Sequence, residues 1–267
     1  RAREGSRMSF AVVTGASSGI GHAFALRLAG RGHDLVVVAR RRPRLEELAG
    51  QVRTAHARRV EVVEADLATA AGRDRLWQAT ERLGEPVEML VNNAGFGLAG
   101  SFLELDRERQ LEMVALNVTA VTDLAHRYLG SMVAHGRGAL VNVASLAAFQ
   151  PVPYFAAYAA TKSYVLALTE ALEEEVRSAG VRVLALCPGP VPTEFQDIAG
   201  TKLEGAVKIV TTTPEECVDL ALAGLDEGRV FVVPGVYNRI LASTVGHFPR
   251  RAVTRLAGAV YRNRTRR

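Results

Sequence analysis

Hydrophobic residues in this chain gather in short runs, which are separated by longer stretches with helical spacing. Consecutive apolar positions rich in Val and Leu are typical of strands buried on both faces of a parallel sheet. Seven such runs are found, and we predict a strand at each of residues 10–13, 34–39, 60–64, 87–91, 139–143, 181–186 and 230–233.

Between these runs, apolar positions recur at the three- and four-residue spacing of helices. The expected helices cover about 21–28, 43–56, 69–84, 103–115, 117–135, a stretch through Tyr158 to about 179, and 214–227. Strands that alternate with helices in this way predict the α/β class. We therefore expect a single-domain, doubly wound fold, with a central parallel sheet of about seven strands and helices on both faces.

The expected domain covers residues 9–235, with no linker or internal repeat inside it. Residues 1–8 are predicted to be a flexible N-terminal arm, and Met8 resembles a start codon. Residues 190–213 lack clear periodicity, and Gly200 and Gly205 suggest a mobile flap over a substrate. Residues 236–267 are predicted to form a C-terminal segment with a basic amphipathic helix and an Arg-rich tail.

Composition excludes several classes of protein. Cys187 and Cys217 are the only cysteines, and neither they nor the six His show metal-ligand spacing, so we expect no metal site and a reducing compartment. No apolar run is long enough to span a bilayer. No hydrophobic segment precedes the first strand, so a signal peptide is not expected and a cytoplasmic location is favoured.

The net charge of +5 comes from the two ends of the chain. Residues 250–267 contain seven Arg and no acid, and residues 1–8 add a net charge of two, which leaves −4 for the body. A basic groove for nucleic acid is therefore not expected.

The helical pattern after Pro249 is amphipathic. Its apolar positions share one face and its arginines lie largely elsewhere; the apolar set is Ala252, Val253, Leu256, Ala259 and Val260. A basic amphipathic helix can rest weakly on an anionic membrane surface, dock on a partner subunit or cover the body of its own domain. The sequence leaves these alternatives open.

A glycine-rich turn, TGASSGIG at residues 14–21, follows the first strand and opens the first helix. Glycines let a backbone approach a phosphate closely, and a helix N-terminus offers free amides and a positive dipole end. The turn is thus a candidate phosphate site, although a plain tight turn would look similar.

The end of the second strand bears on the choice of cofactor. An acid at this place binds the 2′-hydroxyl of the adenosine ribose, whereas an Arg accommodates a 2′-phosphate. Ala39 stands where the acid would be expected, and Arg40 and Arg41 follow. This favours NADP(H) over NAD(H). A solvated position at the start of the next helix is the alternative for Arg41, and it is the preferred interpretation for Arg42.

Proton-transfer chemistry is suggested by three residues in the middle of the chain. Ser145 follows the fifth strand, and Tyr158 and Lys162 are four residues apart in the next helical pattern. Residues at this spacing share a helix face, and a neighbouring cation favours the phenolate of a Tyr. Such a pair also occurs on ordinary solvated helices. Asn117, a poor helix former at the junction of two helical patterns, is either a cap or a functional polar group.

In this order, the motifs closely resemble those of the short-chain dehydrogenase/reductase family. They are TGASSGIG at 14–21, Asp66, NNAG at 92–95, Asn117, Ser145, Tyr158-x-x-x-Lys162 and Pro188-Gly189. The resemblance covers roughly residues 8–235. It implies a Rossmann fold and an NADP(H)-dependent oxidoreductase that assembles as a homodimer or homotetramer.

The resemblance also implies a role for each matched residue. Tyr158 would be the general acid/base, Ser145 would polarise the substrate carbonyl, and Lys162 would hold the ribose and lower the pKa of the phenol. Asn117 would anchor a water that exchanges the proton with solvent. The implied cofactor residues, besides Tyr158 and Lys162, are Gly15, Ser17, Ser18, Gly19, Ile20, Arg40, Arg41, Asp66, Leu67, Asn92, Ala94, Gly95, Pro188, Gly189, Val191 and Thr193.

The expected substrate is an apolar carbonyl compound or secondary alcohol. The side chains predicted to face it are almost all apolar: Phe96, Leu98, Leu146, Phe149, Val152, Tyr154 and Phe195. Further stretches resemble generic bacterial oxidoreductases, and also hydroxysteroid and 3-ketoacyl reductases. The alternatives are an epimerase or dehydratase on the same fold and a non-catalytic, NADP-sensing scaffold; the intact Ser145, Tyr158 and Lys162 disfavour the scaffold.

Overall fold

The computed structural model of the chain describes residues 9–201 and 211–262. The predicted arm at 1–8, part of the predicted flap at 190–213 and the end of the Arg-rich tail lie outside the described residues. Among the described residues, no helix combines the length and the apolar character needed to cross a membrane.

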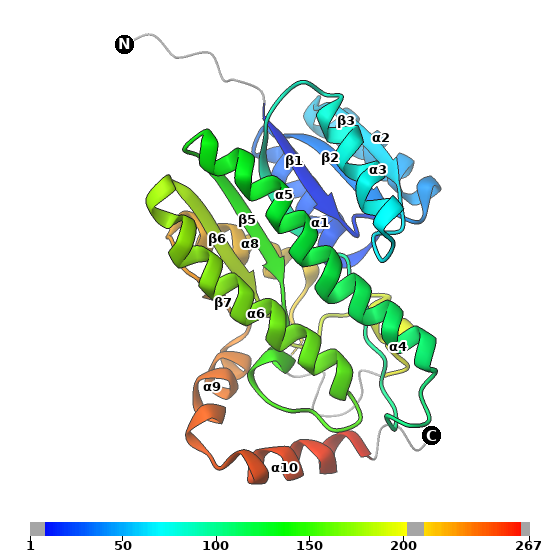
Figure 1. The fold of residues 1–267 in the computed structure, drawn as a ribbon, viewed down its shortest axis with the longest axis vertical. Helices are drawn as coiled ribbons and strands as arrows, with labels where there is room; N and C mark the ends of the chain where they lie inside the picture. Colours follow the sequence, from blue (N-terminus) through cyan, green and yellow to red (C-terminus); the bar gives the residue numbers. More distant parts are fainter. Residues whose placement is uncertain (1–8, 202–210, 263–267) are drawn as a thin grey trace.

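A seven-stranded parallel sheet forms the centre of the molecule (Figure 1). Its strands lie in the order β3-β2-β1-β4-β5-β6-β7, which confirms the predicted fold class. Their bounds are β1 Phe10–Thr14, β2 Asp34–Ala39, β3 Val60–Glu64, β4 Val87–Asn92, β5 Gly138–Val143, β6 Val181–Leu186 and β7 Phe231–Val232. The last strand is shorter than the predicted 230–233, because only these two residues pair with β6.

Helices cover both faces of the sheet, because successive strand residues point to opposite sides. On one face, Ala11 and Val13 pack with α1 (Gly19–Gly30), α2 (Arg42–His56) and α8 (Pro214–Asp226). On the other, Phe10 and Val12 belong to a core formed with α3 (Ala70–Glu81) and α5 (Val121–Ala134). The helix α6 (Ala156–Val176) lies on this second side, against β6.

The two helices predicted around Asn117 form one continuous helical stretch. It comprises α4 (Arg107–Val114), a π-helical segment (Ala115–Ala120) and α5. Asn117 therefore lies inside a wide helical turn and does not cap a helix. Single π-turns of this kind occur often at functional sites.

The C-terminal segment forms a layer beneath the carboxyl edge of the sheet (Figure 1). It consists of α9 (Val236–Thr244), a short turn and α10 (Arg250–Arg262). One more short helix, α7 (Phe195–Ala199), occurs in the stretch whose sequence showed no periodicity. Together these elements enclose the space below the strand ends.

Candidate active site

A cleft of about 1000 Å³ opens at the carboxyl edge of the sheet. The loops after β1, β2, β3, β4, β5 and β6 line it, and α9 and α10 close its far side. In doubly wound folds, ligands bind at this edge, where the strand order reverses. The reversal here lies between β1 and β4, whose following loops both contribute to the lining.

The glycine turn is held in place from β4. Thr14 donates its hydroxyl hydrogen to Val91 O at 3.1 Å, and its Oγ1 accepts the backbone N–H groups of Asn93 and Ala94, both at 2.9 Å. Asn93 Nδ2 donates back to Thr14 O at 2.9 Å. These reciprocal bonds tie together the loops on either side of the strand reversal.

Two glycines of the turn have a backbone that other residues rarely adopt. Gly15 and Gly19 have φ values of +66° and +57°, in the left-handed region. A Cβ atom on Gly15 would lie 2.9 Å from Ala94 Cα, and one on Gly19 would lie 3.0 Å from Thr193 Cγ2. The absent side chains thus leave a cradle of backbone beside Thr193.

The N-terminus of α1 opens into this cradle. Its N-cap residue, Ser18, makes no side-chain capping bond, and its first turn holds no acid. The free amides and the positive end of the helix dipole are therefore available to an anion. The backbone cradle and the uncapped helix fit a dinucleotide pyrophosphate.

Two arginines, Arg40 and Arg41, line the cleft at the end of β2. In dinucleotide-binding folds this place meets the adenosine ribose, so we call it the adenosine end. Arg41 contacts Glu194 Oε2 at 2.7 Å and donates to the hydroxyls of Ser17 and Ser18, both at 3.1 Å. Arg40 pairs with Glu112 at 3.1 Å. The hydrogen bond from Arg41 holds the pKa of Glu194 below its usual range. Both guanidinium groups are about half exposed and accessible to a phosphate.

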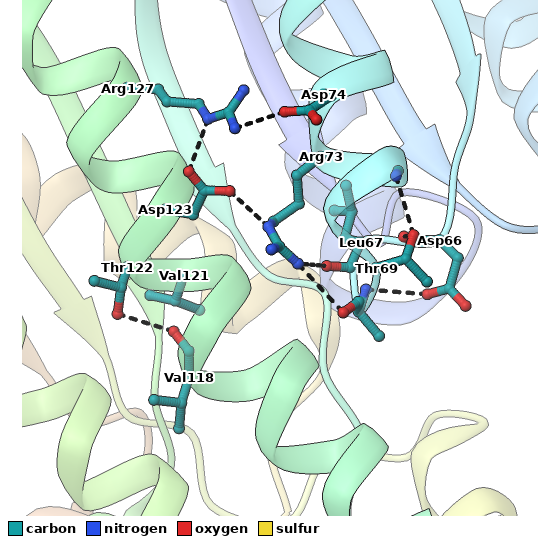
Figure 2. A network of polar contacts seen from close by, with 12 residues as sticks. Asp66, Leu67, Thr69, Arg73, Asp74, Val118, Val121, Thr122, Asp123 and Arg127 are labelled. Atoms are coloured by element: carbon teal, nitrogen blue, oxygen red, sulfur yellow. Dashed lines mark hydrogen bonds and ion pairs between the residues drawn. The ribbon is translucent and has the colours of Figure 1, made fainter.

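The turn that carries Asp66 is anchored to the helices behind it (Figure 2). Arg73, which is almost buried, donates to Leu67 O at 3.1 Å, to Ala68 O at 3.2 Å and to Asp123 Oδ2 at 2.6 Å. Arg127 donates to the other oxygen of Asp123 at 2.7 Å. Burial opposes ionisation of Asp123, but these two arginines hold its pKa below the usual value. Asp66 and Leu67 line the cleft from this braced turn.

Ser145, Tyr158 and Lys162 meet in the same cleft. Lys162 is buried, its Nζ donates to Val143 O at 2.7 Å, and it lies 5.8 Å from the centre of the Tyr158 ring. Burial lowers the pKa of Lys162 from 10.5 to about 8. Ser145, which precedes a short helical turn, accepts the N–H of Ala147 at 3.1 Å.

Asn117 lies behind the cleft and supports its wall. Its side chain is fully buried; Nδ2 donates to Phe96 O at 3.0 Å and to Thr161 Oγ1 at 3.1 Å, and Oδ1 accepts the N–H of Phe96 at 3.2 Å. A Cβ on Gly95 would lie 2.8 Å from Asn117 Oδ1 and 3.5 Å from Lys162 Nζ. Asn117 and Lys162 therefore converge on Gly95.

The side of the cleft beyond Tyr158 is apolar. Four predicted substrate residues line it, namely Phe96, Leu146, Val152 and Phe195. The ring centres of Phe155 and Phe195 lie 4.5 Å and 5.4 Å from that of Tyr158. The far wall comes from α9 and α10 and was not predicted as part of the site; its larger members are Tyr237, Leu241, Phe248, Leu256 and Val260, which we call the C-terminal rim.

Besides Asn117, four predicted site residues lie outside the cleft lining. Asn92 is buried and donates to Asn142 Oδ1 at 3.0 Å, so its side chain joins β4 to β5 and does not face a cofactor. Phe149 packs edge-to-face on Phe231, with ring centres 5.9 Å apart, and lines a separate, smaller pocket. Tyr154 accepts a hydrogen bond from Arg262 Nε at 3.1 Å. Leu98 packs against the cluster around Phe155.

The remaining predicted cofactor residues all line the cleft, from Gly15 through Ile20 at one end to Pro188, Gly189, Val191 and Thr193 at the other. In the described part of the chain, no group of three His, Cys, Asp or Glu could hold a metal ion.

Comparisons with known proteins agree with this architecture. Residues 9–203 match the family model described as short chain dehydrogenase. Among curated proteins, a 7beta-hydroxysteroid dehydrogenase of Collinsella aerofaciens is 30% identical over 230 residues, which cover 85% of this chain and 86% of that protein.

Three solved structures share the fold. A short-chain dehydrogenase from Sphingobium yanoikuyae in complex with NADPH is 34% identical, with a TM-score of 0.79 over 90% of this chain and 95% of its own. A bulky-bulky ketone specific alcohol dehydrogenase from Comamonas testosteroni is 31% identical, with a TM-score of 0.77 over 91% and 94%. A short chain dehydrogenase/reductase from Burkholderia phymatum in complex with NAD is 27% identical, with a TM-score of 0.76 over 88% and 91%.

The match covers most of the chain and agrees with the order of its motifs. This protein belongs to the short-chain dehydrogenase/reductase family of oxidoreductases.

Proposed function

We propose that this protein transfers a hydride between NADP(H) and the carbonyl or secondary alcohol of a bulky apolar substrate. The observation that carries the proposal is a single cleft in which Tyr158 stands between a phosphate cradle and an apolar wall. A group at the Tyr158 hydroxyl can therefore meet a dinucleotide from one side and an apolar molecule from the other.

Tyr158 and Ser145 would act on the substrate oxygen while the nicotinamide exchanges hydride with the substrate carbon. When bound, the nicotinamide supplies the hydride in reduction and accepts it in oxidation. Tyr158 would give its proton to the substrate oxygen in reduction and take it back in oxidation. Ser145 would donate a hydrogen bond to the same oxygen as negative charge develops on it.

Lys162 would support the proton transfer from within the protein. A positive charge near a phenol favours the phenolate, and the 5.8 Å from Lys162 Nζ to the Tyr158 ring allows this influence. Its bond to Val143 O and its burial fix the ammonium in place. Asn117, which holds Phe96 and Thr161, would keep the adjoining wall in register and anchor the water that exchanges the proton.

The preference for NADP(H) rests on Arg40 and Arg41. Both lie at the adenosine end of the cleft, and no acid follows β2 where a ribose 2′-hydroxyl would need one. Glu112 and Glu194 hold the guanidinium groups there, and a 2′-phosphate would provide a more highly charged partner. One structural relative was solved with NADPH and another with NAD, so the arginines of this chain carry the argument.

The apolar substrate is supported by the walls beyond Tyr158. They are formed by aromatic and aliphatic side chains of five segments, namely the loops after β4 and β5 and the helices α7, α9 and α10. Pockets that bind small molecules are lined mainly in this way, with few polar groups to fix orientation. The relatives named for a hydroxysteroid and for bulky ketones act on molecules of the same general kind.

The test is oxidation of NADPH or NADH by the purified protein with a panel of ketones and aldehydes of increasing size. We expect turnover with NADPH and a KM that falls as the apolar substrate grows to fill the cleft. Absence of turnover with every carbonyl and alcohol in the panel would contradict the proposal. Faster turnover with NADH would overturn the part that concerns the arginines.

A further inference from the structure

The C-terminal rim presents large apolar side chains to solvent. Tyr237 is 69% exposed, Phe248 61% and Leu256 70%. Single exposed apolar residues are ordinary on protein surfaces. These three, together with Leu241 and Val260, surround one opening, since all five line the same cleft. A contiguous apolar surface of this kind marks a place of interaction.

The rim is not simply the inner face of α10. That helix is seated on the body of the protein through other residues: Ala257 is buried, and Gly258 faces Pro153, where an added Cβ would lie 3.2 Å from the ring. Leu256 and Val260 are four residues apart and remain exposed. Ala257 and Gly258 thus seat α10 on the body of the protein while Leu256 and Val260 stay exposed.

The same surface carries positive charge that the protein does not neutralise. Arg251 and Arg255 form an exposed row next to Leu256, and Arg250 begins the helix. Within the described residues, none of these three arginines has a carboxylate partner, whereas many arginines elsewhere are paired, for example Arg27 with Asp219 at 2.7 Å. The sequence contains no Asp or Glu after Glu227.

We propose that the C-terminal rim, with the arginines of α10, docks on the surface of an anionic phospholipid bilayer. Apolar side chains of an interfacial helix enter the boundary between headgroups and acyl chains, and arginines beside them bind phosphate groups. Arginine side chains can reach the headgroup level while their stems stay in apolar contact. The helix is too short to span a bilayer, so the contact is peripheral.

A second copy of this chain is a poorer fit to the same surface. A twofold contact centred on the rim would bring the unpaired arginines of both copies into one interface, which has no carboxylate after Glu227 to balance them. Juxtaposed like charges oppose association. An anionic bilayer satisfies both the apolar and the cationic parts of the rim.

Docking in this orientation would turn the mouth of the cleft toward the lipid. An apolar substrate could then pass from the bilayer into the cleft without crossing water. This consequence rests on the proposed function, but the docking itself does not.

The test uses the full chain without cofactor or substrate and measures sedimentation with vesicles. Vesicles of phosphatidylcholine alone are compared with vesicles that also contain phosphatidylglycerol. We expect binding to the anionic vesicles, with an affinity that falls as salt rises. The double variant Arg251→Gln/Arg255→Gln should bind at least tenfold more weakly, and Leu256→Ser severalfold more weakly.

The matched control removes the same charge from the opposite end of the molecule. Arg82 is exposed and Arg58 is partly exposed; they lie in the connections before β4 and β3, at the amino edge of the sheet. Arg58→Gln/Arg82→Gln should bind vesicles like the original protein. Circular dichroism checks that every variant is folded.

Equal binding by the two double variants, or no preference for anionic vesicles, would overturn the proposal. So would a Leu256→Ser variant that changes oligomeric state in light scattering while it binds vesicles normally, because the rim would then be an interface between copies. The measurement contains no turnover, so a failed reductase assay and a failed docking assay remain distinct results.

Discussion

At the scale of single residues, Lys162 combines two demands that oppose each other. In the mechanism proposed above its ammonium assists Tyr158, yet it is buried with Val143 O as its hydrogen-bond acceptor. Burial disfavours the charged form and lowers its pKa to about 8. The protein therefore gives up stability at neutral pH to keep a positive charge in the cleft.

Replacing Lys162 with Met should change how stability depends on pH. Between pH 8 and 10.5, the unfolded chain retains the lysine proton that the native protein has lost, so the free energy of unfolding of the original protein should rise relative to that of Lys162→Met. The relative gain should approach about 3 kcal/mol at high pH. Denaturant titrations of both proteins from pH 7 to pH 10.5 would measure it. A difference that does not vary with pH would contradict the role of burial.

Arg40 and Arg41 at the adenosine end should determine the preference between NADPH and NADH. Arg40→Gln and Arg41→Gln should each raise the Kd for NADPH about tenfold or more, because a charge-assisted bond to the 2′-phosphate is lost. The Kd for NADH should change little. Fluorescence titration with both cofactors would check this. An equal loss of affinity for the two cofactors would instead show that the arginines act through the loop, for example through Ser17 and Ser18.

At the scale of elements, the polar network of Figure 2 joins α3 and α5 to the turn after β3. Arg73 is its centre, because it alone binds both the Asp123 carboxylate and the carbonyl groups of Leu67 and Ala68. In the part of the chain that the structure describes, the hydrogen bonds of Arg73, Asp123 and Arg127 do not reach Ser145, Tyr158 or Lys162. It should therefore affect binding of adenosine and leave the chemistry alone.

Arg73→Met should raise the Kd for NADPH about tenfold while turnover with reduced nicotinamide mononucleotide, which lacks adenosine, stays the same. The Kd of Arg73→Lys should lie between those of the original protein and Arg73→Met, since a compact ammonium cannot span the three acceptors that the guanidinium fork reaches. Asp74→Asn is the control, because it loosens only the exposed outer bond to Arg127. Equal losses with both cofactors would mean that Arg73 merely stabilises the fold.

Most elements could be predicted because their signals are local. Every strand of the sheet corresponds to a short apolar run in the sequence. The motifs that the sequence places at the carboxyl ends of strands lie there in the structure. For Asn92 the motif NNAG implies a cofactor residue, but the motif alone does not show which of its side chains face the cleft. Asn92 still belongs to β4 and pairs in register with Asn142, so the alternation of the strand turns its side chain away from the cleft and turns Asn93 toward the glycine turn.

Other features could not follow from local patterns. The amphipathic helix after Pro249 was predicted, but its position over the cleft depends on contacts with Pro153 and on the bond from Arg262 to Tyr154, both distant in sequence. The π-turn at Asn117 changes one hydrogen-bond register inside a helix and leaves the apolar period nearly intact. Glu194, which holds Arg41, lay in a stretch without periodicity.

At the scale of the whole molecule, the cleft has two chemically different ends with Tyr158 between them. The cationic end and the glycine turn are built from the first half of the chain, and the apolar end is completed by its last helices. The C-terminal segment should therefore determine which substrate sizes the cleft accepts.

Phe248→Ala should raise the KM severalfold for a bulky apolar ketone and leave the KM for a small ketone unchanged. Steady-state assays with both ketones would measure this difference. Equal changes of KM for the two ketones would contradict it.

The central claim is that Tyr158 transfers the proton. Its most direct test is the Tyr158→Phe variant, which keeps the ring and its contacts with Phe155 and Phe195 but removes the hydroxyl. Turnover of NADPH with a ketone should fall about a thousandfold, the usual value of a general acid, while the Kd for NADPH stays within a few-fold of the original. Turnover that survives the substitution would contradict the account.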